Sequence, residues 1–135
     1  HGLTPLVCIG DTREEYQSGK TSIVLEKQVK AALSKVEGSL AKKVLFAYEP
    51  VWSIGEGGTP ADPDFANLEH HKIKSLTQSL VGVTLPVLYG GSVNPDNCVS
   101  LSKQSSIDGL FIGRSAWDVK GYLGICQLVL NAMKE

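Results

Sequence analysis

The sequence predicts an α/β fold in which four parallel strands alternate with helices. Four short apolar runs have the length and composition of buried strands, and each is followed by a segment with helical character. No hairpin signal lies between successive runs, so right-handed crossovers should join parallel strands. The chain has 135 residues, enough for one hydrophobic core, and we expect one domain over residues 1–135.

The strands are expected where these apolar runs end at glycine or at a polar residue. The four runs are residues 6–9 (LVCI), 43–48 (KVLFAY), 86–89 (PVLY) and 109–112 (GLFI). On parallel sheets, chemistry gathers at the carboxyl ends of the strands. Glu49, Ser92 and Gly113 follow three of these runs and should therefore lie at one edge of the sheet.

The helix that follows the first strand has a recognisable start. Thr12 and Glu15 have the spacing of a capping box, in which each side chain satisfies the backbone of the other. A second helix is expected from Thr21 to Val36, because apolar residues recur there at a period near 3.6, and Gly38 sits where that helix would stop.

A third helix should be capped by Asp62 or Asp64 after the glycine-rich loop. We expect its polar face to include His70 and His71, which we interpret as solvated surface rather than a metal site, because neighbouring positions on a helix point apart. The apolar face is expected to consist of Phe65, Leu68, Ile73, Leu76 and Leu80.

The last two helices follow the third and fourth strands. Asn94 followed by Pro95 combines a capping side chain with proline at the first helical position, which predicts a helix start. The apolar-rich segment 117–133 should form the final helix.

Composition excludes several classes of partner. The 13 basic and 14 acidic residues give a net charge of −1, and the basic residues are spread out, so neither nucleic acid nor a membrane surface is expected as a partner. Cys8, Cys98 and Cys126 lack the spacing of a zinc site or a disulfide framework, and we expect buried thiols and a cytoplasmic protein without a metal.

Four βα units fit either a doubly wound sheet or part of a barrel. A complete (β/α)8 barrel takes about 250 residues, so four units in 135 residues match half of one. The first five residues look like the end of a helix that runs into a strand, which suggests that the chain is a piece of something longer.

Glu49 is the first candidate for catalysis. It ends an apolar strand beside a glycine-rich loop, Pro50 keeps it out of the helical region, and Trp52 gives the loop an apolar anchor. A general base under a lid is slightly favoured over the alternative, a capping or surface carboxylate.

Three glycine-rich strand ends are candidates for anion binding. Gly55, Ser92 and Gly113 belong to segments that expose backbone N–H groups, and glycine lets a phosphate approach such donors closely. Any one of these glycines could simply form a turn, but three on one parallel sheet favour binding. Arg114 could add a charged contact to the same anion, or it could be a solvated side chain.

Four segments together resemble the last four strand ends of the triosephosphate isomerase family. The YEPVW segment is highly specific, and the match runs in order through nearly the whole chain. The matching segments are 5–11 (PLVCIGD), 47–55 (AYEPVWSIG), 88–93 (LYGGSV) and 108–113 (DGLFIG).

The resemblance implies the C-terminal half of a TIM (β/α)8 barrel and an isomerase that interconverts an aldose phosphate and a ketose phosphate without a cofactor. Glu49 would be the base, and Gly55, Ser92, Gly113 and Arg114 would hold the substrate phosphate. Tyr89 would steady the closed lid. The lid itself would consist of Pro50, Val51, Trp52, Ser53, Ile54, Gly55, Glu56, Gly57, Gly58, Thr59 and Pro60.

The chain also departs from the family pattern. The family's catalytic lysine and electrophilic histidine belong to the first four strands, so this half should need a complementary N-terminal half-barrel and be poorly active alone. The segment from Arg114 to Trp117 looks more like relatives that isomerise a four-carbon ketose phosphate. Pro60 removes a backbone donor at the far hinge of the lid, and Asp11 replaces a more usual glutamate.

Two hypotheses follow. The first is a sugar-phosphate isomerase acting on triose phosphates, or on erythrulose phosphate, which the family places in the cytoplasm as a homo-oligomer. The second is a non-catalytic phosphate-binding half-barrel that self-associates through its open strand edges.

Overall fold

The computed structural model describes residues 1–134. Its elements are β1 (Leu6–Ile9), α1 (Arg13–Gln17), α2 (Thr21–Leu33), α3 (Gly38–Ala41), β2 (Leu45–Tyr48), η1 (Val51–Ser53), α4 (Pro63–Val81), β3 (Val87–Tyr89), α5 (Cys98–Ser102), β4 (Gly109–Leu110), η2 (Arg114–Ala116) and α6 (Val119–Ala132). The strand-helix order confirms the predicted α/β class.

The strands form one four-stranded sheet in the order β1-β2-β3-β4, and every neighbouring pair is parallel. Cys8, Ala47, Leu88 and Gly109 share one row of the register. Because the strands are parallel and in register, their carboxyl ends meet at one edge. This sheet is the arrangement expected of half a TIM barrel.

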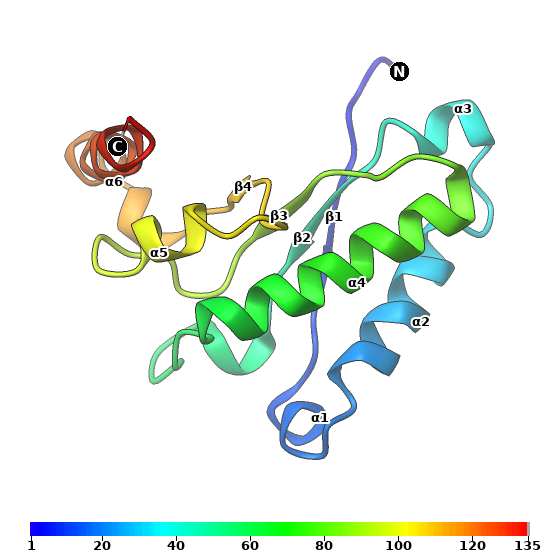
Figure 1. Ribbon diagram of the computed structural model, residues 1–135, viewed down its shortest axis with the longest axis horizontal. Helices are drawn as coiled ribbons and strands as arrows, with labels where there is room; N and C mark the ends of the chain where they lie inside the picture. Colours follow the sequence, from blue (N-terminus) through cyan, green and yellow to red (C-terminus); the bar gives the residue numbers. More distant parts are fainter. Residues whose placement is uncertain (135) are drawn as a thin grey trace.

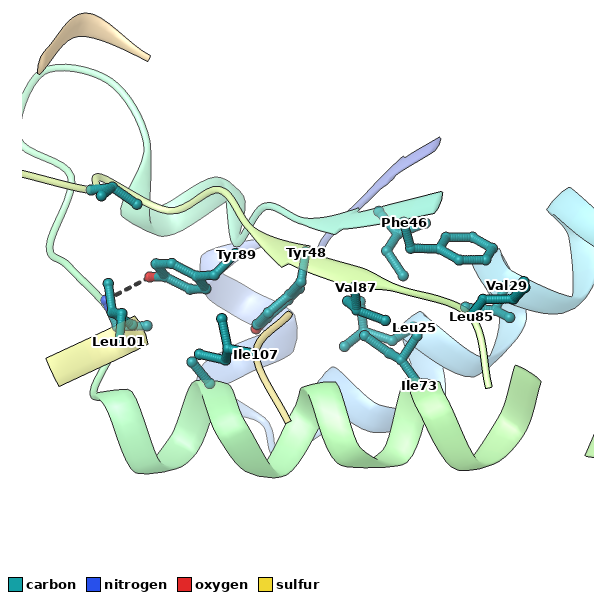
Figure 2. Packing of buried hydrophobic residues seen from close by; sticks show 14 of the residues in the cluster. Leu25, Val29, Phe46, Tyr48, Ile73, Leu85, Val87, Tyr89, Leu101 and Ile107 are labelled. Carbon is teal, nitrogen blue, oxygen red and sulfur yellow. Dashed lines mark hydrogen bonds between the residues drawn. The ribbon is translucent and has the colours of Figure 1, made fainter. Parts of the chain in front are cut away.

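The helices α2 and α4 pack against each other and cover one face of the sheet, as Figure 1 shows. Side chains alternate along a strand, so Phe46, Tyr48, Val87 and Tyr89 all point toward this helical layer. All four are fully buried. Figure 2 shows Val87 between the strands and α4, close to Leu25 and Ile73 from the covering helices.

The opposite face of the sheet lacks such a cover among residues 1–134. Leu6 is 37% exposed and Phe111 is 38% exposed, and Cys8 is exposed as well. An apolar sheet face left open on one side is what half a barrel presents, because a complete barrel fills its interior with side chains from all of its strands.

The helix starts follow the predicted caps closely. Thr12 and Glu15 form the capping box of α1, and Asp62 caps α4 with Pro63 at its first position. Asn94 accepts bonds from the backbone of Asp96 and Asn97, but this turn precedes α5, which begins only at Cys98.

Several boundaries differ from the prediction. Strand β2 begins at Leu45 rather than at Lys43, β3 begins at Val87 rather than at Pro86, and β4 ends at Leu110 rather than at Ile112. Helix α2 ends at Leu33 rather than at Val36, and Gly38 begins the short α3 instead of terminating α2. The final helix starts at Val119 rather than at Trp117. Trp117 is the C-cap of the separate 3-10 turn η2, and the Asp118 side chain caps the helix that follows.

The predicted apolar face of α4 is confirmed for Ile73, which is buried, and for Phe65 and Leu76, which pack against the core, but it is wrong for Leu68 and Leu80. His70 is fully buried, whereas Leu68 and Leu80 are 50% and 43% exposed. The buried stripe consists of Ala66, Glu69, His70, Ile73 and Thr77. This stripe also has helical spacing, so periodicity alone fits both faces and does not decide which one is buried.

His70 is therefore a core residue and not solvated surface. Its ring lies 5.9 Å from that of Tyr48 and 6.1 Å from that of Tyr89, measured between centroids. Burial lowers the pKa of His70 to about 4, although the Asp108 carboxylate acts in the opposite direction. The neighbouring His71 is exposed.

The sequence led us to expect three buried cysteines, and this expectation is wrong for two of them. Cys98 is buried, Cys126 is half-buried and Cys8 is exposed, and all three are free thiols. No helix within residues 1–134 is long and apolar enough to cross a membrane.

We expect the stability of the chain to fall below about pH 6.5 because of His70. The unfolded histidine takes up a proton near pH 6.5, whereas the folded one does so only near pH 4. Stability from this group is fully present above pH 6.5 and is lost as the pH falls toward 4, by roughly 3 kcal/mol. Urea unfolding at pH 7 and at pH 4.5 should show a smaller loss for His70→Leu than for the unchanged chain.

The control for this experiment is His71→Leu, because His71 is the exposed neighbour on the same helix. It should keep the full pH dependence. Equal pH dependence in His70→Leu and the unchanged chain would show that His70 does not carry the effect.

Candidate active site

A cleft of about 700 Å³ opens at the carboxyl ends of β2, β3 and β4. Its lining brings together Glu49, Gly55, Ser92, Gly113 and Arg114, which the sequence had offered separately as a base and as phosphate contacts. Phe111 and Trp117 contribute apolar surface to the same cleft. A carboxylate and several glycine-rich turns therefore share one cavity.

Glu49 is fixed by the backbone of the sheet. Its N–H donates to the carbonyl of Ile9 at 2.7 Å, which extends the β1–β2 ladder by one residue. Glu49 shares the sheet face of Ala47, the face without helices, because side chains two positions apart point the same way.

Glycines on both neighbouring strands leave room for Glu49. A methyl group added to Gly90 would lie 2.7 Å from the Cγ atom of Glu49, and one added to Gly10 would collide with the Glu49 carbonyl. Larger residues at either position would displace the carboxylate.

Cys8 is the neighbour of Glu49 on β1. Desolvation raises the pKa of the Cys8 thiol, and the Glu49 carboxylate beside it raises the pKa further. The thiol therefore stays protonated at neutral pH. The sequence analysis expected Cys8 to be buried and did not predict this contact. In the structure Cys8 pairs with Ala47, and Glu49 lies two positions further along on the same face of the sheet.

The loop after Glu49 is anchored at its first hinge by the buried carboxylate of Asp11. This carboxylate accepts hydrogen bonds from Thr21 at 2.6 Å, from the Tyr48 hydroxyl at 3.0 Å and from the Trp52 indole at 3.3 Å. The Val51 N–H donates to the Asp11 carbonyl at 2.9 Å. The sequence indicated no role for Asp11, whereas the structure shows that it anchors the start of this loop.

Tyr48 is a neutral donor in this network. Desolvation, followed by the Asp11 carboxylate, raises the pKa of Tyr48 far above its ordinary value. The phenol therefore stays protonated at every physiological pH and donates a hydrogen bond to the Asp11 carboxylate.

Trp52 is held from its other side by α1. The Tyr16 ring stacks on Trp52 with centroids 4.2 Å apart, and the Arg13 guanidinium donates to the Trp52 carbonyl at 3.1 Å. Only 7% of Trp52 is exposed, which makes it the apolar anchor that the sequence predicted.

The far hinge of the loop is held by Tyr89. Its hydroxyl accepts a hydrogen bond from the Ala61 N–H at 3.2 Å, drawn as a dashed line in Figure 2. Pro60 has no N–H, so the donor is the following residue. The contact ties Tyr89 to the residue that directly follows the loop.

The middle of the loop reaches the two phosphate candidates. The Ser92 hydroxyl donates to the Ser53 carbonyl, and the Arg114 guanidinium donates to the Gly55 carbonyl at 2.9 Å. Gly55 and Gly57 have φ angles of +84° and +77°, a left-handed conformation that glycine adopts without strain. Both of these residues are exposed, as is Glu56 between them.

Ser92 has a strained backbone with a φ of +43°, which is rare for a residue other than glycine. Its carbonyl accepts bonds from the side-chain amides of Asn94 at 3.4 Å and Asn97 at 3.1 Å. Such strain persists where surrounding contacts fix the conformation, and it is commonest at functional sites.

The histidines do not contribute to this cleft. His70 lies in the core, and His71 lines a separate surface groove with Lys74 and Gln78. Within residues 1–134 no group of three or more metal-ligating side chains is found. The cleft thus combines one carboxylate, that of Glu49, with glycine-rich turns and one guanidinium.

The chain matches the family model described as triosephosphate isomerase over residues 1–129. It is 53% identical over 134 residues to an L-erythrulose-1-phosphate isomerase of Rhizobium meliloti (strain 1021), which covers 98% of this chain and 52% of the relative. The protein of the same name from Brucella abortus (strain 2308) is 54% identical over 126 residues, covering 93% of this chain and 49% of the relative.

A third L-erythrulose-1-phosphate isomerase, from Mesorhizobium japonicum (strain LMG 29417 / CECT 9101 / MAFF 303099), is 51% identical over 126 residues, or 93% of this chain and 50% of the relative. The chain spans about half the length of the curated relatives it matches. With its parallel sheet and the family match over nearly all of its residues, the chain belongs to the triosephosphate isomerase family.

Proposed function

We propose that the chain is the C-terminal half of a sugar-phosphate isomerase that interconverts an aldose phosphate and a ketose phosphate. The observation that carries the proposal is the shared cleft, in which Glu49 faces the turns at Gly55, Ser92 and Gly113. A proton-transfer enzyme needs a base and a substrate grip within one small cavity, and these residues offer both.

Glu49 would remove a proton from the carbon beside the substrate carbonyl and return it to the neighbouring carbon. The carbanion equivalent would be an enediolate, whose negative charge needs preorganised donors. The family resemblance implies that a lysine and a histidine of an N-terminal half-barrel would supply them. The carboxylate becomes a stronger base when water is excluded from it, since desolvation disfavours its charged form.

The loop from Pro50 to Pro60 would supply that exclusion of water. Its two hinges are tied to Asp11 and Tyr89, while its exposed middle lies over the cleft. A phosphate bound by backbone donors of Gly55, Ser92 and Gly113 would bridge the loop to two strand ends. Binding energy from this remote group would then favour the closed state.

The substrate is best proposed as a four-carbon ketose phosphate, with a triose phosphate as the second candidate. Arg114 and Trp117 line the cleft where the resemblance to the triose enzymes expects a smaller residue after Gly113. The relatives of about 53% identity carry the name L-erythrulose-1-phosphate isomerase. Both candidates share the same proton transfer and differ in one carbon.

A complementary half-barrel is the proposed partner. The open face of the sheet and the outer edges of β1 and β4 would receive it, and it would bring the lysine and histidine that the family resemblance implies. A non-catalytic phosphate-binding half-barrel that forms homo-oligomers is the second candidate function, favoured by the same exposed apolar face.

We expect Glu49→Asp to lower kcat/KM for the preferred sugar phosphate about a hundredfold in the protein completed with its N-terminal half. The shorter side chain sets the carboxylate back by about 1 Å from the carbon it deprotonates. Glu26→Asp, on the exposed outer surface of α2, is the matched control and should keep the rate. Unchanged turnover in Glu49→Asp would exclude Glu49 as the base.

The completed protein should also turn over erythrulose phosphate with a higher kcat/KM than glyceraldehyde 3-phosphate. One additional carbon in a fitted pocket typically changes discrimination about 10- to 200-fold. Steady-state assays with both substrates check this expectation. A preference for the triose phosphate would assign the chain to the second substrate candidate.

In analytical ultracentrifugation the chain alone should sediment as a dimer or larger species, because its uncovered apolar face favours association. Adding the separately produced N-terminal half should replace these species by a mixed complex. A monomer that stays monomeric with the added half would contradict both the half-barrel partner and self-association.

A further inference from the structure

Arg114 joins the fourth strand end to the middle of the lid. Its guanidinium donates to the Gly55 carbonyl at 2.9 Å across 59 positions of sequence, and its side chain lines the cleft beside Gly113 and Trp117. Gly55 also receives the Gly58 N–H at 3.3 Å, so the same carbonyl closes the tight turn at the lid tip.

We propose that Arg114 is a positioning residue that couples occupancy of the phosphate site to closure of the lid. The guanidinium would hold the Gly55 carbonyl and an anion in the cleft at the same time. This inference rests on the phosphate site of the proposed function and adds a link between that site and the moving loop.

The chemistry of arginine suits this double contact. A guanidinium presents five N–H donors in a rigid planar fork, and one N–H on the lid carbonyl leaves others for phosphate oxygens. A lysine ammonium lacks the planar fork that would hold two acceptors in a fixed geometry. Arg114 is exposed, so water competes with the Gly55 carbonyl for its N–H groups. A doubly charged anion bound to the guanidinium would displace that water and strengthen the contact.

The other contacts of the lid differ from this one in charge or in place. Ser92 with Ser53 and Tyr89 with Ala61 are bonds between neutral groups. Arg13 also donates to a lid carbonyl, that of Trp52, but it approaches from α1 and does not line the cleft. Arg114 thus combines a positive charge, a lid contact and a position in the cleft.

The charges in the cleft favour the same conclusion. Glu49 and Arg114 are the ionisable side chains that line it within residues 1–134. An arriving phosphate is repelled by Glu49 and attracted by Arg114, so the guanidinium offsets the like charge of the proposed base while it holds the lid. Substitution by a neutral residue should weaken both effects.

Hydrogen exchange of the lid peptide 53–59, followed by mass spectrometry with and without inorganic phosphate, tests the proposal. Without phosphate, Arg114→Met should speed exchange in this peptide about fivefold, which is the effect of losing one exposed charged hydrogen bond. Phosphate should slow exchange in the unchanged chain and have little effect in Arg114→Met. Arg114→Lys should retain part of the phosphate affinity but lose most of the protection.

Arg13→Met is the matched control, because it also removes a guanidinium from a lid carbonyl. It should speed lid exchange, yet phosphate should protect this variant by the same factor as the unchanged chain. Circular dichroism verifies that all variants are folded.

The outcomes separate the two proposals. If phosphate does not protect the lid of the unchanged chain, the phosphate site is wrong and the coupling falls with it. If phosphate protects Arg114→Met as strongly as the unchanged chain, the site stands and the coupling is wrong. If Arg114→Met binds phosphate more weakly but exchanges its lid amides at the unchanged rate, Arg114 contacts phosphate without holding the lid, and the coupling is wrong.

Discussion

The in-register parallel ladder is the constraint on which the rest of the structure depends. Because β1 to β4 run in one direction, the ends of β2, β3 and β4 open into one cleft. The ladder continues past β2 to the Glu49 N–H, so the backbone rather than a flexible side chain sets the position of the carboxylate. Gly90 then leaves space for the Glu49 side chain, and Gly10 leaves space for its backbone carbonyl. The sheet alone thus brings Glu49 and the glycine-rich ends of β3 and β4 to one edge.

The lid shows how polar burial can define a hinge. A buried carboxylate is strongly destabilising unless hydrogen bonds satisfy it, and Asp11 accepts three of them. Because one of the three donors is the Trp52 indole, the same network fixes Trp52 in place. The other hinge, at Tyr89, has a single bond to the backbone. Between these two anchors the loop is exposed and rich in glycine, and its contacts there are to Ser92 and Arg114. The two ends of the loop are therefore fixed by the fold, whereas its middle is exposed and has fewer contacts.

The helices cover the sheet on one side, and this is the feature of the fold behind the proposal of a partner. Helices α2 and α4 bury Phe46, Tyr48, Val87 and Tyr89, whereas Leu6 and Phe111 on the other face remain partly exposed. A barrel interior is a shared core, and half of the strands cannot fill it alone. This partly exposed face also carries Glu49, so the proposed half-barrel partner would cover the open face and adjoin the proposed base at the same time.

The sequence by itself determined the order of the elements, the first strand to the residue, the capping box at Thr12 and the cap at Asp62, because these depend on local periodicity and on short-range hydrogen bonds. It also named Glu49, Gly55, Ser92, Gly113 and Arg114, since each follows a strand whose direction could be inferred. The tertiary structure alone decided that His70 faces the core and that Asp11 holds the lid. It also decided that Arg114 reaches Gly55. Such contacts join segments up to 59 positions apart, and local pattern carries no information about which distant groups the packed sheet will bring together.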